Sequence, residues 1–178
     1  MRHVNVKING TRMHRRKNVR LRQSSYLGRR FYFVTLCCHQ RREIFTHPDR
    51  CRWLLDCLRD VAVSRSFNIH AYCIMPDHIH LLAQGLKPSS DFLNFVKAFK
   101  IKTSREFANQ TNEQLWQKNF YDHIVRPNES AESVAWYIWL NPVRAGLAAH
   151  PKDYPLTGSF TSRYRPASEG GPYKPNEN

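Results

Sequence analysis

Two residue pairs in this chain have the types and the spacing that chemistry requires. His78 and His80 are two residues apart, so on a β-strand both imidazoles point to one face and can bind one metal ion. Tyr137 and Asn141 are four apart, which places a phenol and an amide on one face of a helix. A metal-binding histidine pair, a tyrosine and a nearby oxygen ligand are the minimal set for breaking a DNA phosphodiester through a covalent phosphotyrosine.

The histidine pair has an ordinary alternative, because a bare His-x-His in a strand often makes only hydrogen bonds and short motifs have low specificity. Its context favours a metal site. Ile79 and Leu81 alternate with the histidines, so both imidazoles leave the apolar face together, and the preceding Pro76-Asp77 turn fixes where the strand begins. A divalent cation held by imidazole, amide oxygen and water keeps open positions for phosphate oxygens and polarises the scissile phosphate.

Tyr137 also has two interpretations, which the residues alone leave open. A phenol with its free pKa of about 10 is a weak nucleophile, so it needs a nearby cation. The run 136–139 could instead be a buried aromatic helix face. Tyr121 is the rival nucleophile, but its place on an expected strand predicts packing or substrate contact.

The charge of the chain indicates a polyanionic partner. Lys and Arg number 28 against 14 Asp and Glu, which gives a net charge of +14 in 178 residues. Residues 1–30 contain ten Lys or Arg and no acidic residue, so we expect a basic arm that binds nucleic acid. The expected phosphate-binding residues are Arg12, Arg15, Arg16, Lys17, Arg20 and Arg22 in the arm, with Lys97, Lys100, Lys102 and Arg105 on a helix whose basic face could also be merely solvated.

The remaining composition excludes several classes of protein. Five cysteines lie among apolar residues without any C-x-x-C pair, which predicts buried thiols in a reducing cytosol and excludes a typical zinc or redox centre. No apolar run approaches the roughly 18 residues that span a bilayer, and the basic N-terminus lacks the apolar stretch of a secretory signal. We therefore expect a cytoplasmic protein without a membrane partner.

The hydrophobic patterns predict the element order β-α-β-β-α-β-α. Expected strands cover residues 31–37, 68–75, 78–84 and 116–125, and expected helices cover 51–63, 91–107 and a third that Asn128 caps and Pro142 ends just past Asn141. This order is the split βαβ, ferredoxin-like α/β (α+β) arrangement with an antiparallel sheet and an added C-terminal helix. The expected organisation is a basic arm (1–28), one domain (29–160) and a flexible tail (161–178).

Three ordered motifs resemble the single-tyrosine HUH transposases, and most closely the REP-associated tyrosine transposases of bacteria. The motifs are MPDHIHLL at 75–82, WQKNFYDHIVR at 116–126 and YIWLNPVRAGL at 137–147. The resemblance covers about residues 29–160. One departure is the segment 154–159, which reads YPLTGS where such proteins often show a stretch like Tyr-Pro-Trp-Ser-Ser.

The resemblance implies roles for four residues. His78 and His80 would bind magnesium or manganese, Asn141 would be the third ligand, and Tyr137 would bond to a 5′-phosphate. The implied activity is a metal-dependent endonuclease and strand transferase that cleaves and rejoins single-stranded DNA beside hairpin, REP-type sequences. The alternative is a non-catalytic, basic nucleic-acid-binding module. A monomer is favoured over a helix-swapped dimer, but the sequence leaves open the oligomeric state, the hairpin recognised, and whether DNA is still mobilised.

Overall fold

The computed structural model of the chain describes residues 7–8, 11–12 and 23–161. A five-stranded sheet with the order β6-β3-β5-β4-β7 forms its centre. Its strands are β3 (Phe31–Cys37), β4 (Phe67–Met75), β5 (His78–Gly85), β6 (Tyr121–Ile124) and β7 (Thr157–Gly158). The helices are α1 (Pro48–Ser64), α2 (Phe92–Thr111), α3 (Ala131–Trp139) and α4 (Asn141–Arg144), and a separate hairpin joins β1 (Lys7–Ile8) to β2 (Thr11–Arg12).

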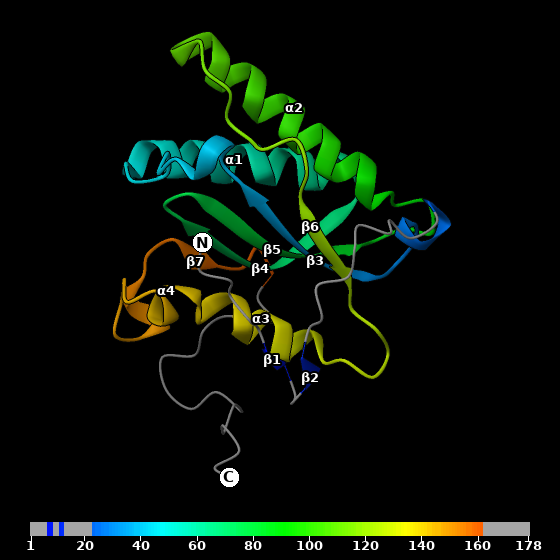
Figure 1. Cartoon of the computed structure of the whole chain (residues 1–178). Helices are drawn as coiled ribbons and strands as arrows, with labels where there is room; N and C mark the ends of the chain where they lie inside the picture. The colour runs from blue at the N-terminus through cyan, green and yellow to red at the C-terminus, as the bar shows by residue number, and fades with distance from the viewer. Residues whose placement is uncertain (1–6, 9–10, 13–22, 162–178) are drawn as a thin grey trace.

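The sheet confirms the ferredoxin-like fold predicted from the sequence. All its pairings are antiparallel, and the strand that follows each crossover helix lies where a split βαβ unit requires. Helices α1 and α2 cover one face of the sheet, whereas α3 and α4 cover the other (Figure 1). Because both faces are covered, the central strands are buried almost continuously instead of in alternation, as the β5 pattern shows.

Each face of the sheet has its own apolar core. The core under α1 and α2 is the larger and includes the fully buried Phe92, Phe95 and Phe99. The core under α3 is smaller and packs Ile138 and Trp139 against the sheet. The histidine pair and Tyr137 lie on the face covered by α3.

Local capping sets where the helices begin and end. The Asp91 carboxylate accepts a hydrogen bond from the Asn94 amide at 3.0 Å and begins α2, which ends where Asn112 adopts a left-handed conformation with φ of 56°. Helix α3 begins two residues later than predicted, because the Ser130 hydroxyl, and not Asn128, accepts from the Ser133 amide at 3.3 Å.

The end of α3 also differs from the prediction. The helix ends at Trp139 with Leu140 as its cap, and Asn141 opens the short helix α4. Pro142 lies in the first turn of α4, where its missing amide hydrogen has no helical partner to lose. Asn141 therefore stands at a joint between two helices and not in the last turn of α3.

The strand predicted for residues 116–125 is shorter than expected. Only Tyr121–Ile124 pairs with β3 as β6. The Trp116 indole is buried and donates to the Thr103 hydroxyl at 2.8 Å, and its backbone makes a single bridge with Cys38. The Gln117 amide also donates to the Cys37 carbonyl at 2.9 Å, so the chain touches the end of β3 here and pairs with it as a regular strand only from Tyr121.

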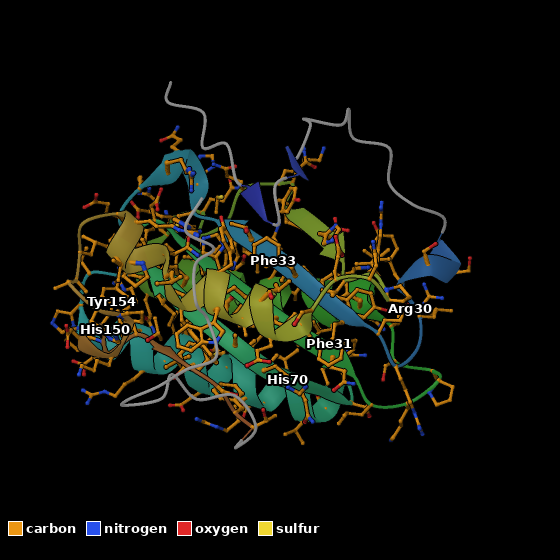
Figure 2. All side chains as sticks on the ribbon, turned by 90° about the horizontal axis from the view of Figure 1, so that it is seen from below. Arg30, Phe31, Phe33, His70, His150 and Tyr154 are labelled. Atoms are coloured by element: carbon orange, nitrogen blue, oxygen red, sulfur yellow. The ribbon has the colours of Figure 1, made fainter. Side chains whose placement is uncertain are left out.

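The segment 154–159, which differs from the stretch typical of the transposases that the sequence resembles, completes the sheet. Thr157 and Gly158 pair with β4 as β7, and the Trp139 indole donates to the Gly158 carbonyl at 3.1 Å. The Tyr154 hydroxyl, labelled in Figure 2, donates to the Ile74 carbonyl at 2.9 Å. This segment therefore ties α3 to the edge of the sheet.

The basic arm lies mostly outside the described residues. Of its predicted phosphate-binding residues, only the backbone of Arg12 is described, in β2, and Arg15, Arg16, Lys17, Arg20 and Arg22 lie outside. Within the described part, no helix is long and apolar enough to cross a membrane. Four of the five thiols are buried there, as the sequence predicts, whereas Cys37 is only half-buried.

Candidate active site

The two histidines of β5 point toward each other on the α3 face of the sheet. The Nε2 atoms of His78 and His80 are 3.0 Å apart, and their rings meet edge to face. Two ligands at right angles on a metal with bonds of about 2.1 Å are separated by about 3.0 Å, which is the cis geometry of an octahedral site. The imidazole pair therefore fits one divalent cation.

Contacts of the Nδ1 atoms of both histidines hold this arrangement. His80 Nδ1 lies 2.8 Å from the Thr35 hydroxyl on the neighbouring strand, and His78 Nδ1 donates to the Asp77 carboxylate. Arg41 forms an ion pair with the other Asp77 oxygen at 3.2 Å. Partners of this kind fix the tautomer of a ligating histidine and leave the Nε2 lone pair directed at the site.

The protonation states agree with a ligand role. Burial, followed by the charge of His78, lowers the pKa of His80 to about 3, so this ring is neutral near pH 7 and its Nε2 can carry a lone pair. Burial raises the pKa of Asp77, but the hydrogen bond and charge of His78, with the charge of Arg41, outweigh it and lower the pKa overall. Asp77 is therefore an ionised orienting group.

Among the described residues, no three His, Cys, Asp or Glu side chains are grouped so that they could hold a metal ion. A cation at the pair thus needs donors of another type, such as an amide oxygen, water or phosphate oxygens. This is the donor chemistry of Mg²⁺ or Mn²⁺ at a phosphoryl-transfer site, and it differs from that of a closed structural zinc site.

Tyr137 lies on α3 and reaches the histidine pair from the helix layer that covers this face of the sheet. Its ring centroid is 6.5 Å from that of His80 and 5.9 Å from that of Phe33, both in edge-to-face geometry. The Arg144 guanidinium carbon lies 4.6 Å from the Tyr137 ring centroid. Burial raises the pKa of Tyr137, and the charge and hydrogen bonding of Arg144 oppose that rise. The tyrosine and the histidines meet within one chain.

Asn141 lies one turn beyond Tyr137 but uses its amide nitrogen locally. Its Nδ2 donates to the carbonyl oxygens of Tyr137 at 2.9 Å and Ile138 at 3.1 Å. These contacts give two carbonyls at the end of α3 a side-chain partner. Its role as a metal ligand through the amide oxygen stays a prediction.

The rival tyrosine lies on the same face of the sheet, at its edge. In the strand register Tyr121 pairs with Thr35, which pairs with His80, so the three side chains form a row across β6, β3 and β5. Thr35 stands between Tyr121 and the histidine. Burial, then the charges of Asp122 and Tyr137, raise the pKa of Tyr121. This environment favours substrate contact over nucleophilic attack.

The basic helix predicted to contact phosphate is not brought to this site. Helix α2 lies on the opposite face of the sheet from α3 (Figure 1). Lys100 donates to the Gln117 and Lys118 carbonyls at 2.7 and 3.0 Å, and Lys102 pairs with Asp60 at 2.8 Å. The other two residues of the predicted set, Lys97 and Arg105, line a surface groove together with Arg65.

Sequence reasoning missed four residues of the site, namely Thr35, Phe33, Arg41 and Arg144. Thr35 carried a signal, because it is the one aliphatic hydroxyl in the apolar run 31–37. Arg144 also carried one, since it follows Tyr137 by seven residues, or two helical turns. All of α1 and β4 lie between Arg41 and Asp77 in the chain, so only the fold brings the two together.

A ferredoxin-like sheet that carries a converging histidine pair, with a tyrosine on an added helix, has the architecture of a single-tyrosine transposase. The chain belongs to the IS200-like transposase family, whose model, "Transposase IS200 like", matches residues 12–140. Proteins of this family cleave DNA and transfer strands, so the chain belongs to a family of enzymes, as the sequence predicts.

Individual proteins agree with this assignment. The chain is 23% identical to the REP-associated tyrosine transposase of Escherichia coli over 144 residues, which are 80% of this chain and 81% of that protein. It is 30% identical to the ISDra2 transposase TnpA of Deinococcus radiodurans over 94 residues, covering 51% and 66%. The structure of a REP-associated tyrosine transposase bound to a REP hairpin shares the fold, with a TM-score of 0.62 and 23% identity over 74% of this chain and 78% of that one.

Proposed function

We propose that this protein is a metal-dependent endonuclease and strand transferase that acts on single-stranded DNA beside hairpin, REP-type sequences. The observation that carries the proposal is the meeting of Tyr137 with the convergent Nε2 atoms of His78 and His80 inside one chain. The hairpin part of the proposal is supported by similar proteins, since the structure of one of them was solved with a REP hairpin bound.

In the proposed reaction the Tyr137 phenolic oxygen attacks the scissile phosphorus. The bond from phosphorus to the 3′ oxygen breaks, so that the 5′-phosphate becomes joined to Tyr137 and the departing strand ends in a 3′-hydroxyl. The phenolic proton is lost and the 3′ oxygen gains one, so the step is balanced without an external energy source. Attack by a second 3′-hydroxyl reverses the step and joins two strands.

The residues of the site divide this work. His78 and His80, with Asn141 as the third ligand, would hold Mg²⁺ or Mn²⁺, which when bound polarises the phosphate and stabilises charge on the leaving oxygen. Asp77 and Thr35 orient the two imidazoles through their outer nitrogens. The nearby Arg144 cation favours the phenolate form of a buried tyrosine.

The test uses hairpin oligonucleotides with single-stranded flanks, labelled at either end and incubated with Mg²⁺ or Mn²⁺. A 5′-phosphotyrosine carries the downstream strand, so a 3′-end label should migrate with the protein in a denaturing gel. A 5′-end label should appear on a free, shortened strand. Tyr137→Phe should remove both products and leave hairpin affinity nearly unchanged, while Tyr121→Phe should keep them. Binding without either product in the wild type would leave a module that only holds DNA.

A further inference from the structure

We propose that Tyr121 is a stacking site for one nucleobase of the single strand next to the scissile phosphate. The inference rests on the proposed function, since it places the substrate strand at Tyr137. It adds a positioning residue at the edge of the sheet, beyond the residues that touch the metal or the reacting atoms.

The exposure of Tyr121 sets it apart from the other rings. Tyr121 is 44% exposed, whereas every other Phe, Trp or Tyr of the described part of the chain is buried or half-buried. An aromatic ring in water is unfavourable unless a partner covers it. Base stacking on such a ring is the usual way in which proteins hold single strands without reading sequence.

The ring packing connects this exposed ring to the reacting groups. Phe33, labelled in Figure 2, lies on β3 beside α3, where its ring is parallel to that of His80 at a centroid distance of 5.7 Å. The same Phe33 meets Tyr121 and Tyr137 edge to face, each at 5.9 Å. One buried ring thus sets the positions of the proposed nucleophile, a metal ligand and the exposed tyrosine.

The strand register shows where the proposed stacking site lies relative to the histidines. Tyr121, Thr35 and His80 form one row across the sheet, so a phosphate at the histidines has Tyr121 two strands away on the same face. Neighbouring strands are about 4.8 Å apart, which places the exposed ring about 10 Å from the histidine. One nucleotide of an extended single strand covers about this distance with its sugar and base. A single base flanking the cleaved bond can therefore reach the ring.

The experiment measures stacking directly, with 2-aminopurine placed in turn at each flanking position of a hairpin oligonucleotide. A Tyr137→Phe background prevents cleavage. We expect fluorescence quenching on binding at one position beside the cleavage site. Tyr121→Leu should abolish the quenching at that position and weaken binding about 5- to 100-fold, whereas Tyr121→Phe should preserve both.

Two controls make the result specific. Ile101→Ala changes another exposed apolar side chain, 56% exposed on α2 across the sheet, and should leave the quenching unchanged. An abasic site at the quenched position should lower the affinity of the protein with Tyr121 intact about 5- to 100-fold. The same abasic site should change the affinity of the Tyr121→Leu protein little. Quenching that survives in Tyr121→Leu, or equal abasic penalties in the two proteins, would overturn the stacking site.

Failure of this inference is distinguishable from failure of the proposed function. If the protein with Tyr137 intact forms the covalent product but Tyr121→Leu quenches normally, only the stacking site is wrong. If quenching depends on Tyr121 but no covalent product forms, the stacking site holds and the proposed chemistry is wrong. Loss of the covalent product in Tyr121→Phe would instead assign Tyr121 to the chemistry.

Discussion

The two faces of the central sheet use the same kind of strand for different purposes. The face under α1 and α2 is covered by a large aromatic core in which Phe92, Phe95 and Phe99 have no exposed surface. The face under α3 is covered by a smaller core, and its strands also carry His78 and His80. The difference shows that a sheet buried on both sides can place stability on one face and keep polar, reactive groups on the other.

The difference between the faces follows from which helix covers which strand positions. A long helix such as α2 presents a continuous apolar stripe, so polar strand residues beneath it would be buried without partners. The nine-residue α3 covers less of the sheet. The histidines at the start of β5 therefore keep partners in Thr35 and Asp77 and stay within reach of a substrate.

The face under α3, which carries the histidine pair, is called the reactive face below. The variants with the largest expected effect on it test whether one chain supplies the whole site. His80→Ala and Tyr137→Phe should each abolish the covalent product. A mixture of the two variants should stay inactive, because the Tyr137 ring contacts His80 of its own chain. Gel detection of the protein-linked label checks this. Recovery of activity in the mixture would mean that α3 completes the site of another copy.

The other face should respond to mutation mainly through stability. Phe99→Ala removes a fully buried ring from the α1/α2 core and should lower the free energy of unfolding by about 3–5 kcal/mol. Val63→Ala, at a position 77% exposed on α1, should change it by less than about 0.5 kcal/mol. Urea unfolding followed by circular dichroism measures both. A Phe99→Ala protein of normal stability and lost cleavage would contradict the division between faces.

On the reactive face, a ligand should matter more than a group that orients a ligand. Asn141→Ala should weaken Mn²⁺ binding by more than the 10- to 100-fold that loss of an outer partner causes, for which Thr35→Val is the control. Spin-resonance measurement of free Mn²⁺, with the oligonucleotide bound in a Tyr137→Phe background, compares the two. Unchanged Mn²⁺ affinity in Asn141→Ala would reduce that residue to capping α3 through the Tyr137 carbonyl.

The smallest effect concerns charge on the α2 surface. If Lys97 and Arg105 each contact a phosphate, replacing both by Gln should flatten the slope of log affinity against log salt by about 1.4. Cleavage at saturating DNA should be unchanged, since α2 lies across the sheet from Tyr137. Filter binding at several salt concentrations measures the slope. An unaltered slope would show that this helix face is only solvated.

Several features followed from the sequence because they depend on local chemistry. The alternation of His78 and His80 with apolar residues is a property of any strand, so their common face could be predicted before the fold was known. The order of strands and helices followed from hydrophobic periodicity, and the ferredoxin-like sheet confirms it. The family was also predictable, because three motifs that resemble it occur in order along the chain, and the family model matches residues 12–140.

Other features depend on contacts between distant segments, and the sequence alone did not determine them. At His70 a β-bulge interrupts the pairing of β4 with β5, so that Ile69 packs under α1 and α2 while Ala71 packs under α3, although alternation would put both on one face. The basic residues of α2 point away from the site for a similar reason, since the apolar stripe of the helix sets its face. The side of the sheet on which α3 packs brings Tyr137 to the histidines, and only the packing of the whole chain decides that.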